Sequence, residues 1–151
     1  MLNSDYKDML QILLEEDVKF IIVGAYALAA HGYPRATGDI DIWIKPDQQN
    51  AIKVLHSLKR FGAPLYSITE KDFLESGTIF QIGTAPRRID IITSITGVEF
   101  DEAYSDCLIV EIEGLKISVL SIEKLIKNKE ATGREKDILD AKFLRTKINK
   151  Q

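Results

Sequence analysis

Residues 39–44, which read D-I-D-I-W-I, decide the fold, because isoleucine alternates there with other side chains. A period of two predicts a β-strand with isoleucine on one face and Asp39, Asp41 and Trp43 on the other. The isoleucine face is expected to pack against helices. Two neighbouring carboxylates repel each other and lose hydration when buried, so the opposite face needs solvent or a cation.

A divalent cation would hold Asp39 and Asp41 together, since Mg²⁺ prefers oxygen ligands and binds through a few carboxylates and substrate phosphates. The alternative is an exposed edge strand with two solvated aspartates. Trp43, on the same face, either stacks on a base or packs in the core, and packing is the more usual role of a tryptophan.

Residues 88–92 (R-I-D-I-I) repeat the pattern and place Asp90 on the face opposite Ile89. If this strand lies beside residues 39–44, the carboxylate of Asp90 joins the other two. Three converging carboxylates suffice for two Mg²⁺ or Mn²⁺ ions that activate an attacking oxygen and stabilise a leaving pyrophosphate. Taken alone, Asp90 fits an ion pair with Arg87 or Arg88 better.

The rest of the chain alternates between helical and strand patterns without a repeat or linker, which predicts one α/β domain over residues 1–151. Helices within residues 121–148 belong to it, with Ser121 as an N-cap and Gly133 between two helices. Residues 62–77 lack periodicity and are predicted as a loop with one helical turn near 71–75. The predicted helices cover 5–16, 24–30, 47–60, 121–130 and a segment after Gly133, and the predicted strands cover 18–23, 39–44, 78–82, 88–93, 107–113 and 115–120.

The composition is that of an ordinary globular protein, with 45% hydrophobic and 28% charged residues. The N-terminus does not resemble a signal peptide and no apolar run approaches about 18 residues, so a cytoplasmic location without a membrane span is expected. The single cysteine, Cys107, is expected in the core. Residues 1–113 carry a net charge of −8 and residues 114–151 one of +5. Broad binding of duplex nucleic acid, which needs a basic face, is therefore not expected.

Val23-Gly24-Ala25, followed after thirteen residues by D-I-D-I, resembles the signature of the DNA polymerase β-like nucleotidyltransferase superfamily, and Asp90 matches its third carboxylate. Ala25 stands where that superfamily usually has Gly or Ser. Over about residues 18–144 the chain is similar to small bacterial members, including relatives of toxin-type nucleotidyltransferases. The resemblance implies a mixed sheet with helices mainly on one face and an open catalytic face.

The resemblance also implies an activity, the transfer of a nucleoside monophosphate from a triphosphate such as ATP to an acceptor, with Asp39, Asp41 and Asp90 as catalytic metal ligands. The start of the helix at Gly24 and Ala25 would hold phosphates, as helix N-termini do. Arg35 and Thr37, in the loop before the aspartate strand, are candidates for phosphate contact or for an ion pair that fixes the loop. By the same resemblance, Lys129 and Arg134 are expected to contact the triphosphate, and Asp137 and Asp140 are expected to orient these two cations.

The acceptor stays open at this point: a small molecule, a tRNA or a protein are all compatible with the sequence. Two other readings remain. One is a non-catalytic module that binds a nucleotide or a partner, and the other is a toxin that acts on RNA or protein beside an antitoxin. A homodimer would supply an acceptor surface that so short a chain lacks.

Overall fold

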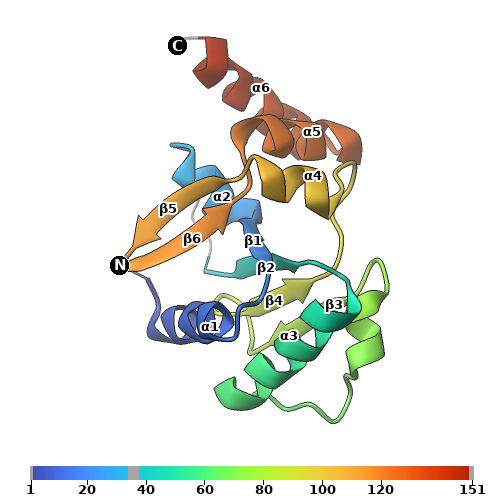
Figure 1. Ribbon diagram of the computed structural model, residues 1–151. Helices are drawn as coiled ribbons and strands as arrows, with labels where there is room; N and C mark the ends of the chain where they lie inside the picture. Colours follow the sequence, from blue (N-terminus) through green and yellow to red (C-terminus); the bar gives the residue numbers. More distant parts are fainter. Residues whose placement is uncertain (1, 34–37, 150–151) are drawn as a thin grey trace.

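Strand β2 (Ile40–Ile44) lies inside a six-stranded mixed sheet of the order β3-β4-β2-β1-β6-β5. The computed structural model describes residues 2–33 and 38–149, and Figure 1 shows the sheet between two groups of helices. The α/β fold predicted from the alternating pattern is therefore confirmed. The other strands are β1 (Phe20–Val23), β3 (Ile79–Ile82), β4 (Ile89–Ile92), β5 (Leu108–Ile112) and β6 (Leu115–Val119).

The pairing of the strands brings the two aspartate patterns together. Strand β2 runs parallel to β4, and the register places Asp41 directly opposite Asp90. Strand β1 is antiparallel to β2 on its other side and parallel to β6. Because β2 and β4 are neighbours and run in the same direction, both aspartates point to the same face of the sheet.

The helices lie on both sides of the sheet. In the view of Figure 1, α1 (Ser4–Glu15) and α3 (Gln48–Phe61) lie below the central strands, with the short 3₁₀-helix η1 (Glu70–Leu74) beside α3. The other helices lie above the sheet in the same view, namely α2 (Gly24–Ala30), α4 (Phe100–Ser105), α5 (Ile122–Thr132) and α6 (Glu135–Asn149). The face that carries the aspartates is thus partly covered by the C-terminal helices.

Most helix ends are where the capping residues place them. The side chain of Ser121 accepts a hydrogen bond from the Lys124 amide at 3.2 Å, and Gly133 ends α5 in the left-handed conformation. His31 caps α2, and its Nε2 lies 2.7 Å from the Leu120 carbonyl oxygen. Helix α4 has no counterpart among the predicted elements, because its six residues are too few to display a helical period.

The isoleucine face of β2 forms part of the core, and Ile40, Ile42 and Ile44 are at most 2% exposed. Trp43 on the opposite face is also buried, and its ring meets the Phe100 ring edge-on with centroids 5.1 Å apart. Packing rather than base stacking is therefore the role of Trp43. Cys107 is only partly buried, short of the core position expected for it. None of the described helices is long and apolar enough to cross a membrane.

Candidate active site

The centre of the candidate site is a pair of carboxylates on neighbouring strands. Asp41 on β2 and Asp90 on β4 lie side by side, and Asp90 is only 7% exposed. The pKa of Asp41 is raised to about 6, first by burial and then by the charge of Asp90, a hydrogen bond with Asp90 and the charge of Asp39. Two carboxylates this close favour either a shared proton or a bound cation.

Arg88 is the cation that the chain itself supplies to this cluster. Its Nε donates to Asp90 Oδ1 at 2.7 Å and its Nη2 to Asp90 Oδ2 at 3.1 Å, which is a bidentate pair. Nη2 also lies 3.4 Å from Asp39 Oδ2, and the Arg88 amide donates to Asp39 Oδ1 at 3.0 Å. The ion pair between Asp90 and Arg88, which the sequence suggested, is therefore present, and Arg88 also pairs with Asp39.

The prediction of a metal site can be compared with this geometry. Across residues 2–33 and 38–149, no three His, Cys, Asp or Glu side chains are arranged to hold a metal ion. The donor set nevertheless fits a hard cation, because Asp41 and Asp90 are adjacent oxygen donors, and burial together with the charge of Asp90 raises the Asp41 pKa. Asp39 would join them once its carboxylate left Arg88.

Glycine is needed at position 24 for two reasons, the turn between β1 and α2 and the close approach of the Asp41 carboxylate. It stands between β1 and α2 with φ +67°, a conformation that favours glycine. A Cβ atom at this position would lie 2.2 Å from Asp41 Oδ2. Any other residue would therefore displace the Asp41 side chain, and this is a reason for glycine that the sequence alone does not reveal.

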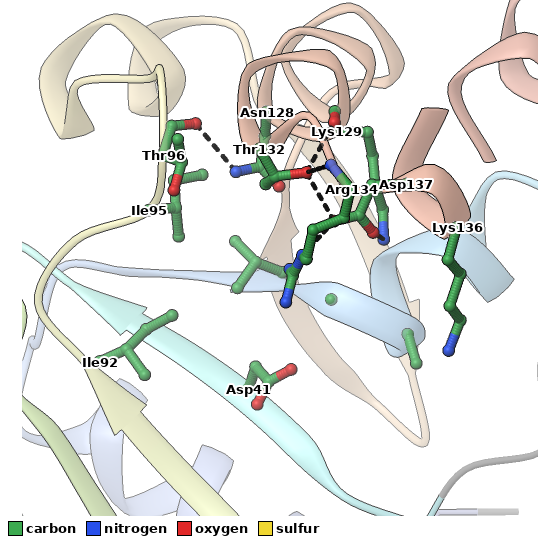
Figure 2. A pocket seen from close by; sticks show the side chains of 13 residues that line it. Asp41, Ile92, Ile95, Thr96, Asn128, Lys129, Thr132, Arg134, Lys136 and Asp137 are labelled. Carbon is green, nitrogen blue, oxygen red and sulfur yellow. Dashed lines mark hydrogen bonds and ion pairs between the residues drawn. The ribbon is translucent and has the colours of Figure 1, made fainter. Parts of the chain in front are cut away.

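A cavity of about 430 Å³ opens above Asp41. Gly24, Ala25 and Asp41 line it from the sheet side, while residues of α5, of α6 and of the turn between them line the opposite side (Figure 2). Lys129, Arg134 and Lys136 contribute cationic side chains there. The structure thus brings the predicted phosphate-binding residues of two distant segments to one cavity.

Lys129 and Arg134 differ in how far they are buried, although the sequence suggested the same role for both. Lys129 is only 12% exposed, and its Nζ lies 3.2 Å from Asp137 Oδ1 and 3.3 Å from Asp140 Oδ2. The Arg134 side chain is 76% exposed and points across the cavity toward Asp41 in Figure 2, while its Nε lies 2.8 Å from Asp137 Oδ2. The orienting role expected of Asp137 and Asp140 is consistent with these contacts.

Asp137 is the hub of this second cluster. Burial alone would raise the pKa of Asp137, but hydrogen bonds from Thr132 and Lys129, the charge of Lys129 and a hydrogen bond from Arg134 hold it below its ordinary value. Thr132 Oγ1 donates to Asp137 Oδ2 at 2.7 Å. Asp137 is thus held by hydrogen bonds and ion pairs, and the cluster contains two cationic and two acidic side chains.

Some predicted residues fall elsewhere and some contributors were not predicted. Arg35 and Thr37 lie outside the described residues. Lys136 and Asn128 line the cavity, but nothing in their spacing distinguishes them from ordinary helix-surface residues. Arg88 was named only as an ion-pair partner, and its place two residues before Asp90 was the available signal.

Comparison with known proteins agrees with the fold and shows the family. Six solved chains match the structure. One is the crystal structure of a "putative nucleotidyltransferase" from Thermotoga maritima, with a TM-score of 0.61 and 20% sequence identity, over 100% of this chain and 97% of that chain. Residues 2–148 match the family described as nucleotidyltransferase of unknown function (DUF6036), so the chain belongs to that family. Among curated proteins no match was found.

Proposed function

We propose that this protein transfers a nucleoside monophosphate from a nucleoside triphosphate to an acceptor, with Mg²⁺ or Mn²⁺ held by Asp39, Asp41 and Asp90. One observation carries the proposal: Asp41, which lies opposite Asp90 on the neighbouring strand, faces a wall with cationic side chains across a cavity of about 430 Å³. Polyphosphate with a divalent cation is a ligand that suits both walls at once.

The cationic residues would neutralise the phosphates. Arg134 is exposed, reaches toward Asp41 and offers guanidinium donors that match phosphate oxygens. Lys136 adds a second charge from the first turn of α6. Lys129 would act more indirectly, because its ammonium group is already paired with Asp137 and Asp140. Its role would be to hold the cationic side chains of this wall in place.

The carboxylates would act at the reacting phosphate. A bound divalent cation supplies charge neutralisation of the phosphates and favours a deprotonated acceptor. Asp90 would accept the proton of the acceptor hydroxyl once its carboxylate was released from Arg88. Arg88 would then be available to stabilise the displaced pyrophosphate or remain on Asp39.

The experiment replaces Asp41 with Asn and measures melting temperature with and without Mn²⁺ and a non-hydrolysable triphosphate. At a ligand concentration a hundredfold above Kd, the wild type should gain about 5–10 °C. The D41N variant should lose this gain while its ligand-free melting temperature stays equal or rises, because one of two repelling carboxylates is gone. Asp8→Asn, an exposed aspartate of α1, is the matched control and should keep the gain.

The Arg88 pairs favour one other candidate, a non-catalytic module that binds nucleotide without transferring it. Arg88 pairs with Asp39 and Asp90 without any added cation. The two candidates differ in the release of pyrophosphate from a triphosphate in the presence of cell extract. Nucleotide binding without metal-dependent pyrophosphate release would favour the module.

A further inference from the structure

Strand β5 forms one edge of the sheet, and one of its two sides has no partner strand. Among the described elements β6 is its only strand neighbour, and Figure 1 shows the two as a hairpin at one end of the sheet. Leu108 and Ile109 are 41% and 57% exposed. Natural sheets usually protect a free edge with lysine, proline, a bulge or a covering loop. β5 has neither lysine nor proline and pairs with β6 without a bulge, so this edge is open to another strand.

The turn of the hairpin determines which backbone groups of β5 face outward. Glu113 and Gly114 form a two-residue connection with φ +48° and +87°, as a type I′ turn requires. The residues that flank such a turn, here Ile112 and its partner, exchange hydrogen bonds, and bonded and non-bonded pairs alternate from there along the strands. Ile109 and Glu111 therefore turn their N–H and C=O groups away from β6. In the described part of the chain, no backbone group outside the hairpin bonds to either residue.

These outward groups make β5 complementary to a second copy of itself. In an antiparallel pair with a two-fold axis at Val110, Ile109 of each copy lies opposite Glu111 of the other, and each of these two pairs would exchange two hydrogen bonds. On the face that packs against the core, Val110 would meet its own copy, and Leu108 would meet Ile112 of the other copy. The strand thus supplies both the backbone groups and the apolar side chains that its own edge lacks.

Charge and hydrogen bonding favour this register over its neighbours. A one-residue slip would place the apolar side chains on the wrong face, so only shifts of the axis by whole positions need comparison. An axis at Glu111 would oppose two carboxylates, and like charges directly opposite each other destabilise a sheet. An axis at Ile109 would leave only one hydrogen-bonded pair within the strand. With the axis at Val110, each Glu111 lies between Lys116 of its own hairpin and an isoleucine of the other copy.

We propose that this protein forms a two-fold dimer in which the β5 strands of two copies pair and join their sheets into one. The contact uses the same strand on both copies, so it closes at two. It is small, and a weak dimer with a Kd of the order of micromolar is therefore expected. No β5 residue lines the cavity above Asp41, so the dimer would form whether or not the proposed nucleotidyl transfer takes place.

Two substitutions of one exposed residue test the pairing. Ile109→Glu places a carboxylate opposite Glu111 of the other copy, twice in each dimer, and should raise the dimer Kd by about tenfold or more. Ile109→Lys removes the same apolar side chain but offers Glu111 a cation, so its Kd should stay within about threefold of the wild-type value. Sedimentation velocity over a concentration series would measure both. Ile79→Glu, at a 62% exposed position of the other edge strand, β3, is the matched control and should leave the Kd unchanged.

A cross-link tests the position of the two-fold axis. In a Cys107→Ser background, Val110→Cys should form a disulfide between two copies, because the Cα atoms of a non-hydrogen-bonded antiparallel pair lie about 4.5 Å apart. Ile109→Cys in the same background should not, because its two copies would lie on a diagonal, about 7–8 Å apart, which is too far for a disulfide. Electrophoresis without reductant would detect the cross-linked dimer.

Several results would overturn the inference. A wild type that stays monomeric throughout the concentration series would do so, as would growth beyond two copies, because one edge paired with itself cannot extend. Equal weakening by Ile109→Glu and Ile109→Lys would mean apolar adhesion without strand pairing, and loss of the dimer in Ile79→Glu would move the contact to β3. Both residues are exposed, so each variant should keep the wild-type melting temperature, which separates lost association from unfolding.

Discussion

Two charged clusters lie on either side of the cavity above Asp41, which Asp41, Lys129, Arg134 and Asp137 line, and the two clusters balance their charges in opposite ways. On the sheet side, three carboxylates share one guanidinium. On the helix side, two cations meet two carboxylates. We call these groups the sheet wall (Asp39, Asp41, Arg88, Asp90) and the helix wall (Lys129, Arg134, Asp137, Asp140).

The difference shows what each wall is suited to do. Burial and the excess negative charge on the sheet wall raise the Asp41 pKa and make this wall responsive to protons and cations. The helix wall satisfies its own charges, with Asp137 only 5% and Asp140 only 1% exposed, and therefore behaves as part of the folded framework. Arg134 is the exception, because it is exposed and extends from that framework toward the sheet wall.

The largest effect is expected from Lys129→Ala. Removing Lys129 leaves Asp137 and Asp140 buried with one cation fewer, and breaking a buried ion pair costs about 3–5 kcal/mol. Urea denaturation would measure the change in the free energy of unfolding. Lys136→Ala removes an exposed cation from the same cavity and should cost less than about 0.5 kcal/mol. Equal losses in the two variants would mean that the helix wall does not support the fold.

A smaller effect, with a sign set by pH, is expected from Asp41→Asn. The folded-state pKa of Asp41 is raised from 3.8 to about 6, so the folded protein binds more protons than the unfolded chain between these values. Stability therefore falls as the pH rises through this window, by up to about 3 kcal/mol.

The variant carries no titrating group at this position, so it should be as stable as the wild type below pH 4 and more stable above pH 6. Chemical denaturation of both proteins at pH 4, 5, 6 and 7 would measure the difference. A difference that does not vary with pH would remove the argument that Asp90 and burial perturb Asp41. Asp8→Asn, which changes an exposed aspartate, provides the baseline for the comparison.

The two walls were not equally visible in the sequence. On the sheet wall, alternation fixed the face of Asp41, and the parallel register of β2 and β4 confirmed that Asp90 joins it. That register depends on strand pairing over long sequence separation, which no local pattern encodes, and so does the position of Arg88 between Asp39 and Asp90.

The helix wall was harder to predict, because helical charges usually belong to a solvated face. The interleaved cations and aspartates of residues 127–140 predicted a charged cluster, but they did not predict that Lys129 is buried.

The smallest effect on stability, and the sharpest on ligand binding, is expected from Arg134→Ala. The side chain is 76% exposed, so its loss should change the free energy of unfolding by less than about 0.5 kcal/mol. A charge-assisted contact to phosphate contributes about 1.5–3 kcal/mol, so the Kd of a non-hydrolysable triphosphate with Mn²⁺ should rise tenfold or more, which calorimetric titration would measure. Arg145→Ala, an exposed arginine of α6 paired with Glu130, is the matched control and should leave this Kd unchanged. Together with Lys129→Ala, the result separates the framework of the helix wall from its contact with ligand. An unchanged Kd in Arg134→Ala would mean that the helix wall makes no ligand contact through this residue. The helix wall would then be a purely structural pair of helices that faces a reactive sheet wall.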